Sequence, residues 1–282
     1  MAAREHASTV VAEGFAYAEC PRWHDGRLWF SDQYGGSVVT LEPGGAPQEV
    51  LAVPGRPAGL GWTPDGRLLV VAMEEHRLLV ADHGHLEVLA ELAAFHGGPS
   101  NDMVVDRQGR AYVGNIGFDY YAGQAPTPTV LTLVDLDGTV RVVAEDLLVP
   151  NGSVLSPDGS VLVVAESFGH RLTAFDVAAD GGLSGRRSFA ELGDLVPDGI
   201  CLDAAGAIWA ATVAGGIVRV EEGGQVTDHV TTTRRHAYAC VLGGPEGRTL
   251  YACTADADDP ASALALRSSA IETLEVAVPG PG

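Results

Sequence analysis

The stretch NGSVLSPDGSVLVVAES, residues 151–167, contains a pattern from which the fold can be predicted. A short apolar run leads into the polar turn SPDG, which ends at Gly159, and a second apolar run follows. Aspartate followed by glycine favours a tight turn, and apolar runs on both sides of such a turn favour paired strands. The stretch therefore predicts a β-hairpin.

The same pattern occurs six times along the chain. The six turns end at Gly26, Gly66, Gly109, Gly159, Gly206 and Gly247, which lie 40, 43, 50, 47 and 41 residues apart. Two more strand-like segments follow most of the hairpins, so each unit holds about four strands. Repeats of this length and content are typical of propeller blades. We expect an all-β, six-bladed β-propeller that forms a single domain over residues 1–282, in preference to a pair of β-sandwiches.

The two ends of the chain are expected to meet in the last blade. The segments STVVAEG (residues 8–14) and IETLEVAV (residues 271–278) both resemble strands. Pairing them would close the ring and remove exposed sheet edges. A helical period is not sustained anywhere, so the sequence predicts no long helix.

Charge and cysteine content limit the classes of partner and the location. The net charge is −20, from 37 acidic residues against 17 basic residues that are all arginine. A field of this sign repels nucleic acids and anionic membranes, so we expect neither as a partner. Neither a signal-peptide-like apolar run nor a membrane-spanning one is evident. The four cysteines lack CxxC spacing, and we expect buried thiols in a cytoplasmic protein.

The residues at the start of each hairpin share a chemical character. Counting back eight residues from each turn glycine, or seven for the shorter first turn, gives one position per blade. In chain order these positions are Glu19, Ala58, Asn101, Asn151, Asp198 and, with a less regular alignment, Ala239. The first strand of a propeller blade usually lines the channel, so these positions should form a ring around one axis.

Four members of this ring offer side-chain oxygen: Glu19, Asn101, Asn151 and Asp198. Asparagine or aspartate before glycine is also a common turn residue, but four such residues in register favour a site. Converging oxygens with two carboxylates suit one hard divalent cation, because two carboxylates neutralise it. We expect Ca²⁺, with Mg²⁺, Mn²⁺ or Zn²⁺ as alternatives, although Zn²⁺ more often recruits histidine or cysteine.

Weaker candidates lie outside this ring. The aromatic loop over residues 117–128 contains Phe118, Asp119, Tyr120 and Tyr121, which would contact substrate if the loop covers the channel mouth. A surface loop packed by its own aromatic residues is an equally good interpretation. His236 is a further candidate substrate contact near the mouth. Glu74 and Glu166 end second strands, and we interpret them as structural polar groups.

Five motifs together resemble the senescence-marker-protein, gluconolactonase and luciferin-regenerating-enzyme family of six-bladed propellers. In chain order they are AECPRWHDGRLWFSD (18–32), SND (100–102), PNG (150–152), PDG (197–199) and AYACVLGGPEGRTLYACTA (237–255). The resemblance covers nearly the whole chain. It implies a divalent metal held by Glu19, Asn151 and Asp198, with Asn101 as a fourth ligand or a substrate contact.

The resemblance also implies hydrolysis of a lactone, often a sugar lactone, with Asp198 as the general base that activates water. One position departs from the family, since Pro99 stands where its sugar-lactone members often carry arginine. Two alternatives stay open: a metal-dependent hydrolase of other esters or phosphotriesters, and a Ca²⁺-binding propeller that binds a ligand without turnover. We expect a small lactone or ester as the partner, and a monomer or small homo-oligomer.

Overall fold

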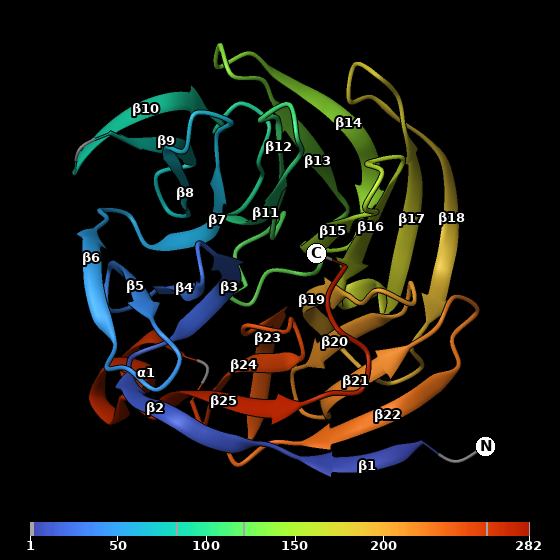
Figure 1. The fold of residues 1–282 in the computed structure, drawn as a ribbon. Coiled ribbons are helices and arrows are strands. Elements are labelled where there is room, and N and C mark those ends of the chain that lie inside the picture. The colour runs from blue at the N-terminus through green and yellow to red at the C-terminus, as the bar shows by residue number, and fades with distance from the viewer. Residues whose placement is uncertain (1–2, 83, 121, 258, 282) are drawn as a thin grey trace.

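The computed structural model describes residues 3–82, 84–120, 122–257 and 259–281. Its strands form six sheets arranged as blades around a central channel (Figure 1). The six-bladed β-propeller is therefore confirmed. All six hairpin-turn glycines adopt a φ between 66° and 85°, a conformation that glycine reaches without steric cost.

The first three blades are four-stranded antiparallel sheets built from consecutive strands. Blade 1 contains β3 (Ala18–His24), β4 (Arg27–Asp32), β5 (Ser37–Leu41) and β6 (Gln48–Ala52). Blade 2 contains β7 (Pro57–Trp62), β8 (Leu68–Ala72), β9 (Arg77–Asp82) and β10 (His85–Glu91). Blade 3 contains β11 (Ser100–Val105), β12 (Ala111–Asn115), β13 (Thr129–Val134) and β14 (Val140–Leu147).

The last three blades follow the same plan, but blades 5 and 6 each gain a strand from the N-terminus. Blade 4 contains β15 (Pro150–Leu155), β16 (Val161–Glu166), β17 (Arg171–Val177) and β18 (Leu183–Glu191), with a 3-10 turn η1 (Ser167–Gly169). Blade 5 contains β19 (Pro197–Leu202), β20 (Ile208–Thr212), β21 (Gly216–Val220), β22 (Val226–Thr231) and the added β1 (Arg4–Ala7). Blade 6 contains β23 (His236–Gly243), β24 (Thr249–Ala255), β25 (Ser269–Glu275) and β2 (Thr9–Phe15).

The N-terminal segment closes the ring. As expected, β2 pairs antiparallel with β25, with Thr9 opposite Thr273. The sequence did not predict that β1 also pairs, in parallel, with β22 of blade 5. Arg4 anchors β1 there, because its Nε lies 2.8 Å from Oδ1 of the buried Asp228. The N-terminus thus spans two blades along their outer edges (Figure 1).

A short helix, α1 (Pro260–Leu266), is inserted before β25. Its N-cap is Asp259, whose side chain accepts a hydrogen bond from the Ser262 N–H at 3.0 Å. Two turns are too short to show a helical period in the sequence. Within the residues that the structure describes, no helix is long and apolar enough to cross a membrane.

The apolar core lies between neighbouring blades, where the first strands pack closely. A Cβ at Gly59 on β7 would lie 2.5 Å from the backbone N of Met103 on β11, so only glycine allows this approach. All four cysteines are free and buried, which confirms that part of the cysteine prediction.

Glu272 on β25 is fully buried at the point where the ring closes. Its carboxylate accepts hydrogen bonds from the hydroxyls of Ser8 (2.5 Å), Thr254 (2.7 Å) and Thr233 (2.8 Å), and from the backbone N–H groups of Thr233 (2.9 Å) and Arg234 (3.2 Å). Burial raises the pKa of Glu272, but these hydrogen bonds outweigh it and hold the pKa below its ordinary 4.5. The folded protein therefore stabilises the ionised form.

Replacing Glu272 by glutamine is expected to lower the free energy of unfolding by about 2–3 kcal/mol at neutral pH, because hydrogen bonds to a charged group are lost. Since folding lowers this pKa, the stabilisation is present above the ordinary value of 4.5 and is lost as pH falls through the folded value. The gap between wild type and variant should then narrow in acid. Urea unfolding of wild type and variant at neutral pH and in acid tests this, with Glu87→Gln at an exposed position on β10 as control. Equal stability of wild type and Glu272→Gln at neutral pH would contradict the prediction.

Candidate metal centre and active site

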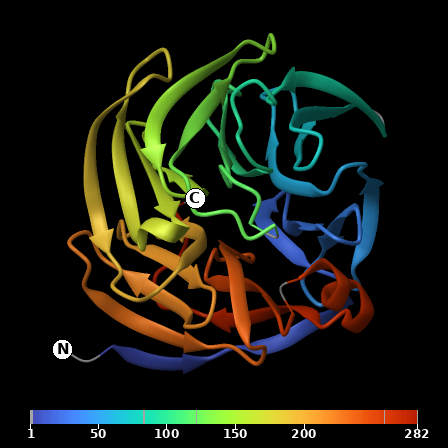
Figure 2. The ribbon, with the colours of Figure 1, turned by 180° about the vertical axis from the view of Figure 1, so that it is seen from behind.

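Six first strands surround the channel. Each of β3, β7, β11, β15, β19 and β23 contacts the next in chain order, and β23 contacts β3 to complete the circle. Figure 2 shows the same ring from the opposite side. The first strand of each blade starts near the residue predicted to face the channel and ends at its hairpin turn. The hairpin turns therefore lie at the opposite end of the channel from these residues.

Every first strand contains a β-bulge near its start. The pairing register shifts between Pro57 and Leu60 in blade 2, between Pro150 and Ser153 in blade 4, and equivalently in the other four blades. Successive side chains of a regular strand point to the two faces of its sheet, toward the neighbouring blades. A bulge changes the direction of a side chain. Asn101, Asn151 and Asp198 lie within the bulges of blades 3, 4 and 5, whereas Glu19 lies directly before the bulge of blade 1.

A cavity of about 350 Å³ lies at the end of the channel where the first strands begin. The four residues predicted from the sequence all line it: Glu19, Asn101, Asn151 and Asp198. Glu19 and Asn101 are buried, with 6% and 8% of their surface exposed, and Asn151 and Asp198 are partly open to the cavity. The structure thus brings together residues that lie up to 179 positions apart in the sequence.

The two carboxyl groups are in an environment that opposes their ionisation. Burial raises the pKa of Glu19 to about 7, with a further contribution from the Asp102 carboxylate. Burial also raises the pKa of Asp198 well above its ordinary value, and Glu19 adds to this, whereas a hydrogen bond from Asn151 acts in the opposite direction. Asn151 also donates from Nδ2 to the Ser167 hydroxyl at 3.2 Å, which orients its amide.

The buried Asp102 and the partly buried Arg22 form an ion pair next to these carboxyl groups. Arg22 Nη2 lies 2.6 Å from Asp102 Oδ1, and Arg22 Nε donates to the Leu60 carbonyl at 3.1 Å. Arg22 is therefore the cationic partner of Asp102. In the described part of the chain, no ion pair is formed by Glu19 or Asp198. Two enclosed negative charges therefore have no direct cationic partner when both groups are ionised.

This donor set fits a hard divalent cation. Glu19 and Asp198 supply two negative charges, and Asn151 and Asn101 supply neutral amide oxygens, a combination that Ca²⁺ and Mg²⁺ accept readily. Across the described residues, no three His, Cys, Asp or Glu side chains form a metal-binding group. A site here would therefore depend on the two amides and on water for its remaining ligands.

The ring position in blade 6 corrects the sequence alignment. Tyr238, and not Ala239, is the extra residue of the bulge in β23, and Tyr238 lines the cavity. The hairpin of blade 6 is one residue longer than that of blade 5, so counting back eight residues stops one position too late. Ala239 is instead buried in the apolar core.

Among the described residues of the aromatic loop, one lines the cavity. In Figure 2 the green segment between β12 and β13 extends toward the centre of the ring. Tyr120 lines the cavity, whereas Phe118 and Asp119 are not among its described lining residues. Phe118 is buried and packs edge-on against Phe168, with ring centroids 5.6 Å apart. Tyr121 lies outside the described residues.

The other candidates from the sequence lie beside the cavity or away from it. His236 is buried, its Nδ1 lies 2.6 Å from the Val213 carbonyl, and it is not among the described lining residues. Glu166 is fully buried and paired with Arg171 and Arg186 at 2.9 and 3.1 Å, which confirms a structural role. Glu74 is exposed, and its Oε1 lies 3.4 Å from Nη1 of Arg56.

Several lining residues were missed from the sequence. Tyr17, Tyr34 and Tyr238 form a tyrosine cluster on the cavity wall, with centroid distances of 5.0 Å for Tyr17–Tyr34 and 4.7 Å for Tyr17–Tyr238. Burial raises the pKa of Tyr17 well above its ordinary value, so this phenol stays protonated. Arg56 also lines the cavity. The sequence repeat could have identified Arg56 as a lining residue, because RPAG (56–59) repeats the pattern of VPNG (149–152) and VPDG (196–199).

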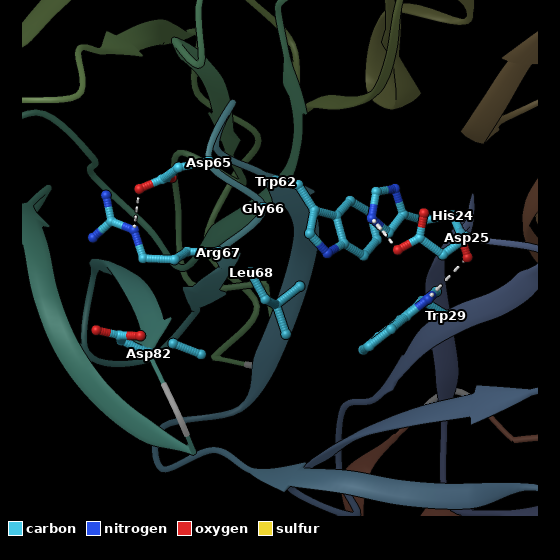
Figure 3. Close-up of a pocket in the computed structure, with 10 residues that line it drawn as sticks. His24, Asp25, Trp29, Trp62, Asp65, Gly66, Arg67, Leu68 and Asp82 are labelled. Carbon is cyan, nitrogen blue, oxygen red and sulfur yellow. Dashed lines mark hydrogen bonds and ion pairs between the residues drawn. The ribbon is translucent and has the colours of Figure 1, made fainter.

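A second hollow of about 740 Å³ lies at the hairpin-turn end of blades 1 and 2 (Figure 3). The His24 ring stacks on Trp62 at 3.9 Å, and Trp29 packs edge-on against Trp62. Its charged residues already have partners, since Arg67 Nε lies 2.9 Å from Asp65 Oδ2 and both side chains are exposed. The hollow is an open surface groove, and it contains no enclosed charge of the kind found in the channel.

The fold and the cavity define a six-bladed propeller whose channel contains a cavity lined by carboxyl and amide side chains. Residues 17–256 match the family described as the SMP-30/gluconolactonase/LRE-like region, and the chain belongs to this family.

Relatives support the same family assignment. The chain is 31% identical to a 6-deoxy-6-sulfogluconolactonase of Pseudomonas putida, over 96% of this chain and 95% of the relative. It is 28% identical to a pentonolactonase of Haloferax volcanii, over 90% and 87% of the two chains. The fold is similar to the crystal structure of a calcium-binding protein, regucalcin, from Agrobacterium tumefaciens, with a TM-score of 0.82 and 22% identity over 99% and 97% of the two chains.

Proposed function

We propose that this protein is a lactone hydrolase that depends on one divalent cation, with Ca²⁺ as the first candidate. The observation that carries the proposal is the convergence of two enclosed carboxyl groups and two amides in one cavity, with no direct cationic partner for the carboxyl groups among the described residues. Both lactonase relatives support the reaction class. The calcium-binding protein of similar fold supports the choice of cation.

The residues that would hold the cation are Glu19, Asn151 and Asp198, with Asn101 as a fourth ligand or a substrate contact. When bound, a divalent cation polarises a lactone carbonyl and stabilises the negative charge that develops on its oxygen. Each protein group supplies oxygen, so the set favours Ca²⁺ or Mg²⁺ over Zn²⁺. Asn151 is held in place by Ser167, which fixes the direction of its amide.

Asp198 is the proposed general base. Its carboxylate accepts a proton from the attacking water, whose oxygen bonds to the lactone carbonyl carbon. The ring C–O bond then breaks, and the proton passes to the ring oxygen, which leaves as a hydroxyl of the product acid. The tyrosine cluster of Tyr17, Tyr34 and Tyr238 would pack against the substrate ring and exclude bulk water from the cavity.

A panel of lactones, assayed by proton release in the presence of Ca²⁺, tests the proposed reaction. We expect turnover of at least one small lactone, because ring opening yields an acid that releases a proton. Simple esters and a phosphotriester belong in the same panel. Hydrolysis of those compounds alone would assign a different ester class, and binding without any turnover would assign a ligand-binding protein.

Calcium is expected to stabilise the folded protein, because only the folded chain brings the four oxygens together. A concentration of about 100 Kd should add roughly 2.7 kcal/mol, which corresponds to a rise in Tm of about 4–5 °C for a chain of this size. Thermal unfolding in CaCl2, in EDTA and in NaCl of equal ionic strength measures this effect. Identical Tm values in all three would contradict a calcium site.

A further inference from the structure

Arg56 is the only arginine among the described residues that line the cavity. We infer that its guanidinium binds an oxyanion substituent of the substrate, so that the preferred lactone carries a carboxylate, sulfonate or phosphate group away from its carbonyl. This inference rests on the proposed lactone hydrolysis and specifies the substrate class. The inferred contact uses the positive charge of Arg56, whereas the proposed metal site uses the negative charges of Glu19 and Asp198.

The position of Arg56 follows from the blade repeat. Arg56 precedes Pro57 as Val149 precedes Pro150, and the two residues share a positive φ, 63° and 56° respectively. Val149 lines the cavity as well. Arg56 is therefore the blade 2 counterpart of an apolar wall residue in blade 4. Arginine in place of valine introduces a charge that packing does not require.

The backbone and the ring of Tyr34 hold Arg56 in position. The Arg56 carbonyl accepts a hydrogen bond from the Met73 N–H at 2.9 Å, which ties this residue to the end of β8. The guanidinium carbon lies 4.7 Å from the centroid of the Tyr34 ring, within the range of a cation–π contact. A cation held in advance loses little conformational entropy when it binds an anion.

Most hydrogen-bond donors of Arg56 are unused. Its Nε is buried and has no hydrogen-bond partner in the described part of the chain. Its Nη1 lies 3.4 Å from Oε1 of Glu74, at the long end of the hydrogen-bond range, and the Glu74 side chain is 60% exposed. An exposed ion pair of this kind contributes little. A guanidinium offers five N–H donors in a planar fork that matches an oxyanion, so this one has capacity for a ligand.

The charge of the whole protein strengthens the argument. With a net charge of −20, the surface repels anionic ligands. A neutral lactone needs no cationic side chain in the cavity, whereas an anionic lactone needs one to offset this field. At the corresponding place in blade 3, Pro99 offers no donor. Arg56 is the cavity residue that distinguishes these two substrate classes.

Kinetics with paired substrates test the inference. The pair is a six-carbon δ-lactone with a C6 hydroxyl and its counterpart with a C6 carboxylate, and sulfonate and phosphate analogues then identify the preferred oxyanion. Arg56→Gln is expected to lower kcat/KM for the carboxylate lactone by about 10- to 100-fold and for the neutral lactone by less than about 3-fold. Equal losses for both lactones would overturn the inference.

Two further variants separate recognition from general electrostatics. Glu74→Gln removes the competing carboxylate and should raise kcat/KM for the carboxylate lactone alone. Arg67→Gln removes the same charge at the opposite end of the propeller, 11 residues along the chain, and should change neither substrate. A loss of carboxylate preference in Arg67→Gln equal to that in Arg56→Gln would contradict a specific contact.

A binding measurement makes the test independent of turnover. Calorimetric titration of the Ca²⁺-loaded protein with methyl glucuronide and methyl glucoside compares an anionic and a neutral ring that a lactonase cannot open. Wild type should bind the glucuronide more tightly, and Arg56→Gln should bind both equally. Glucuronide preference without lactone turnover would refute the proposed function and retain the anion site. Turnover without this preference would refute the anion site alone.

Discussion

Replacing Asp198 by asparagine is expected to lower kcat for lactone hydrolysis by about 10²- to 10⁴-fold, the usual range for removal of a general base. Asparagine keeps the size of the side chain and one oxygen for a metal, but it cannot accept the proton of the attacking water. The fold should be retained, because Asp198 lies open to the cavity and forms no ion pair with a described residue.

The measurement for this variant is turnover of the best lactone, together with the Ca²⁺ affinity from calorimetry. Both are needed, since a weaker metal site would also reduce turnover. Asp194→Asn is a suitable control, because Asp194 is an exposed carboxylate four residues earlier on the approach to β19. Near-normal kcat in the Ca²⁺-saturated Asp198→Asn variant would exclude the general-base role.

Replacing Glu19 by glutamine is expected to weaken Ca²⁺ binding by about 100-fold or more, because affinity in oxygen sites depends strongly on the number of charged ligands. Asn101→Ala removes only a neutral amide and should weaken binding by about 10-fold at most. Calorimetric titration of both variants compares the two positions directly. A larger loss in Asn101→Ala than in Glu19→Gln would contradict the assignment of ligands.

In the metal-free protein, Glu19→Gln is expected to have the opposite effect and to raise the thermal stability. Burial raises the pKa of Glu19 to about 7, so folding disfavours its ionised form. At a pH above that value, metal-free wild type must keep a buried charge that Glu19→Gln does not have. The variant should therefore have the higher Tm in EDTA, and wild type the higher Tm in Ca²⁺. Thermal unfolding in the two buffers shows whether the order reverses.

Much of the fold and of the site could be predicted because both follow from a local repeat. The glycine-centred turns fixed the number of blades, since each turn glycine is required by a positive φ in one hairpin. The residues at Asn101, Asn151 and Asp198 share one spacing from those turns, and the ring of first strands places them in one cavity. The repeat shows which distant residues lie close together in the fold, which a single sequence usually does not.

The missed features depend on contacts that the repeat does not encode. The predicted ring position in blade 6 was Ala239 instead of Tyr238, because the hairpin of that blade is one residue longer. A bulge makes the direction of a side chain sensitive to a shift of one residue. The parallel pairing of β1 joins residues more than 220 positions apart, such as Arg4 and Asp228. Arg56 was overlooked because Ala58, in the ring position of its own repeat, offers no ligand atom.

We expect lactone hydrolysis to require one divalent cation, held by Glu19, Asn151 and Asp198 in the channel. The most direct measurement titrates metal-free protein with Ca²⁺ while recording both bound metal and lactone turnover. We expect no turnover at zero occupancy and a linear rise in turnover that ends at one bound cation per chain. Full turnover in the metal-free protein, or turnover that does not follow occupancy, would contradict it.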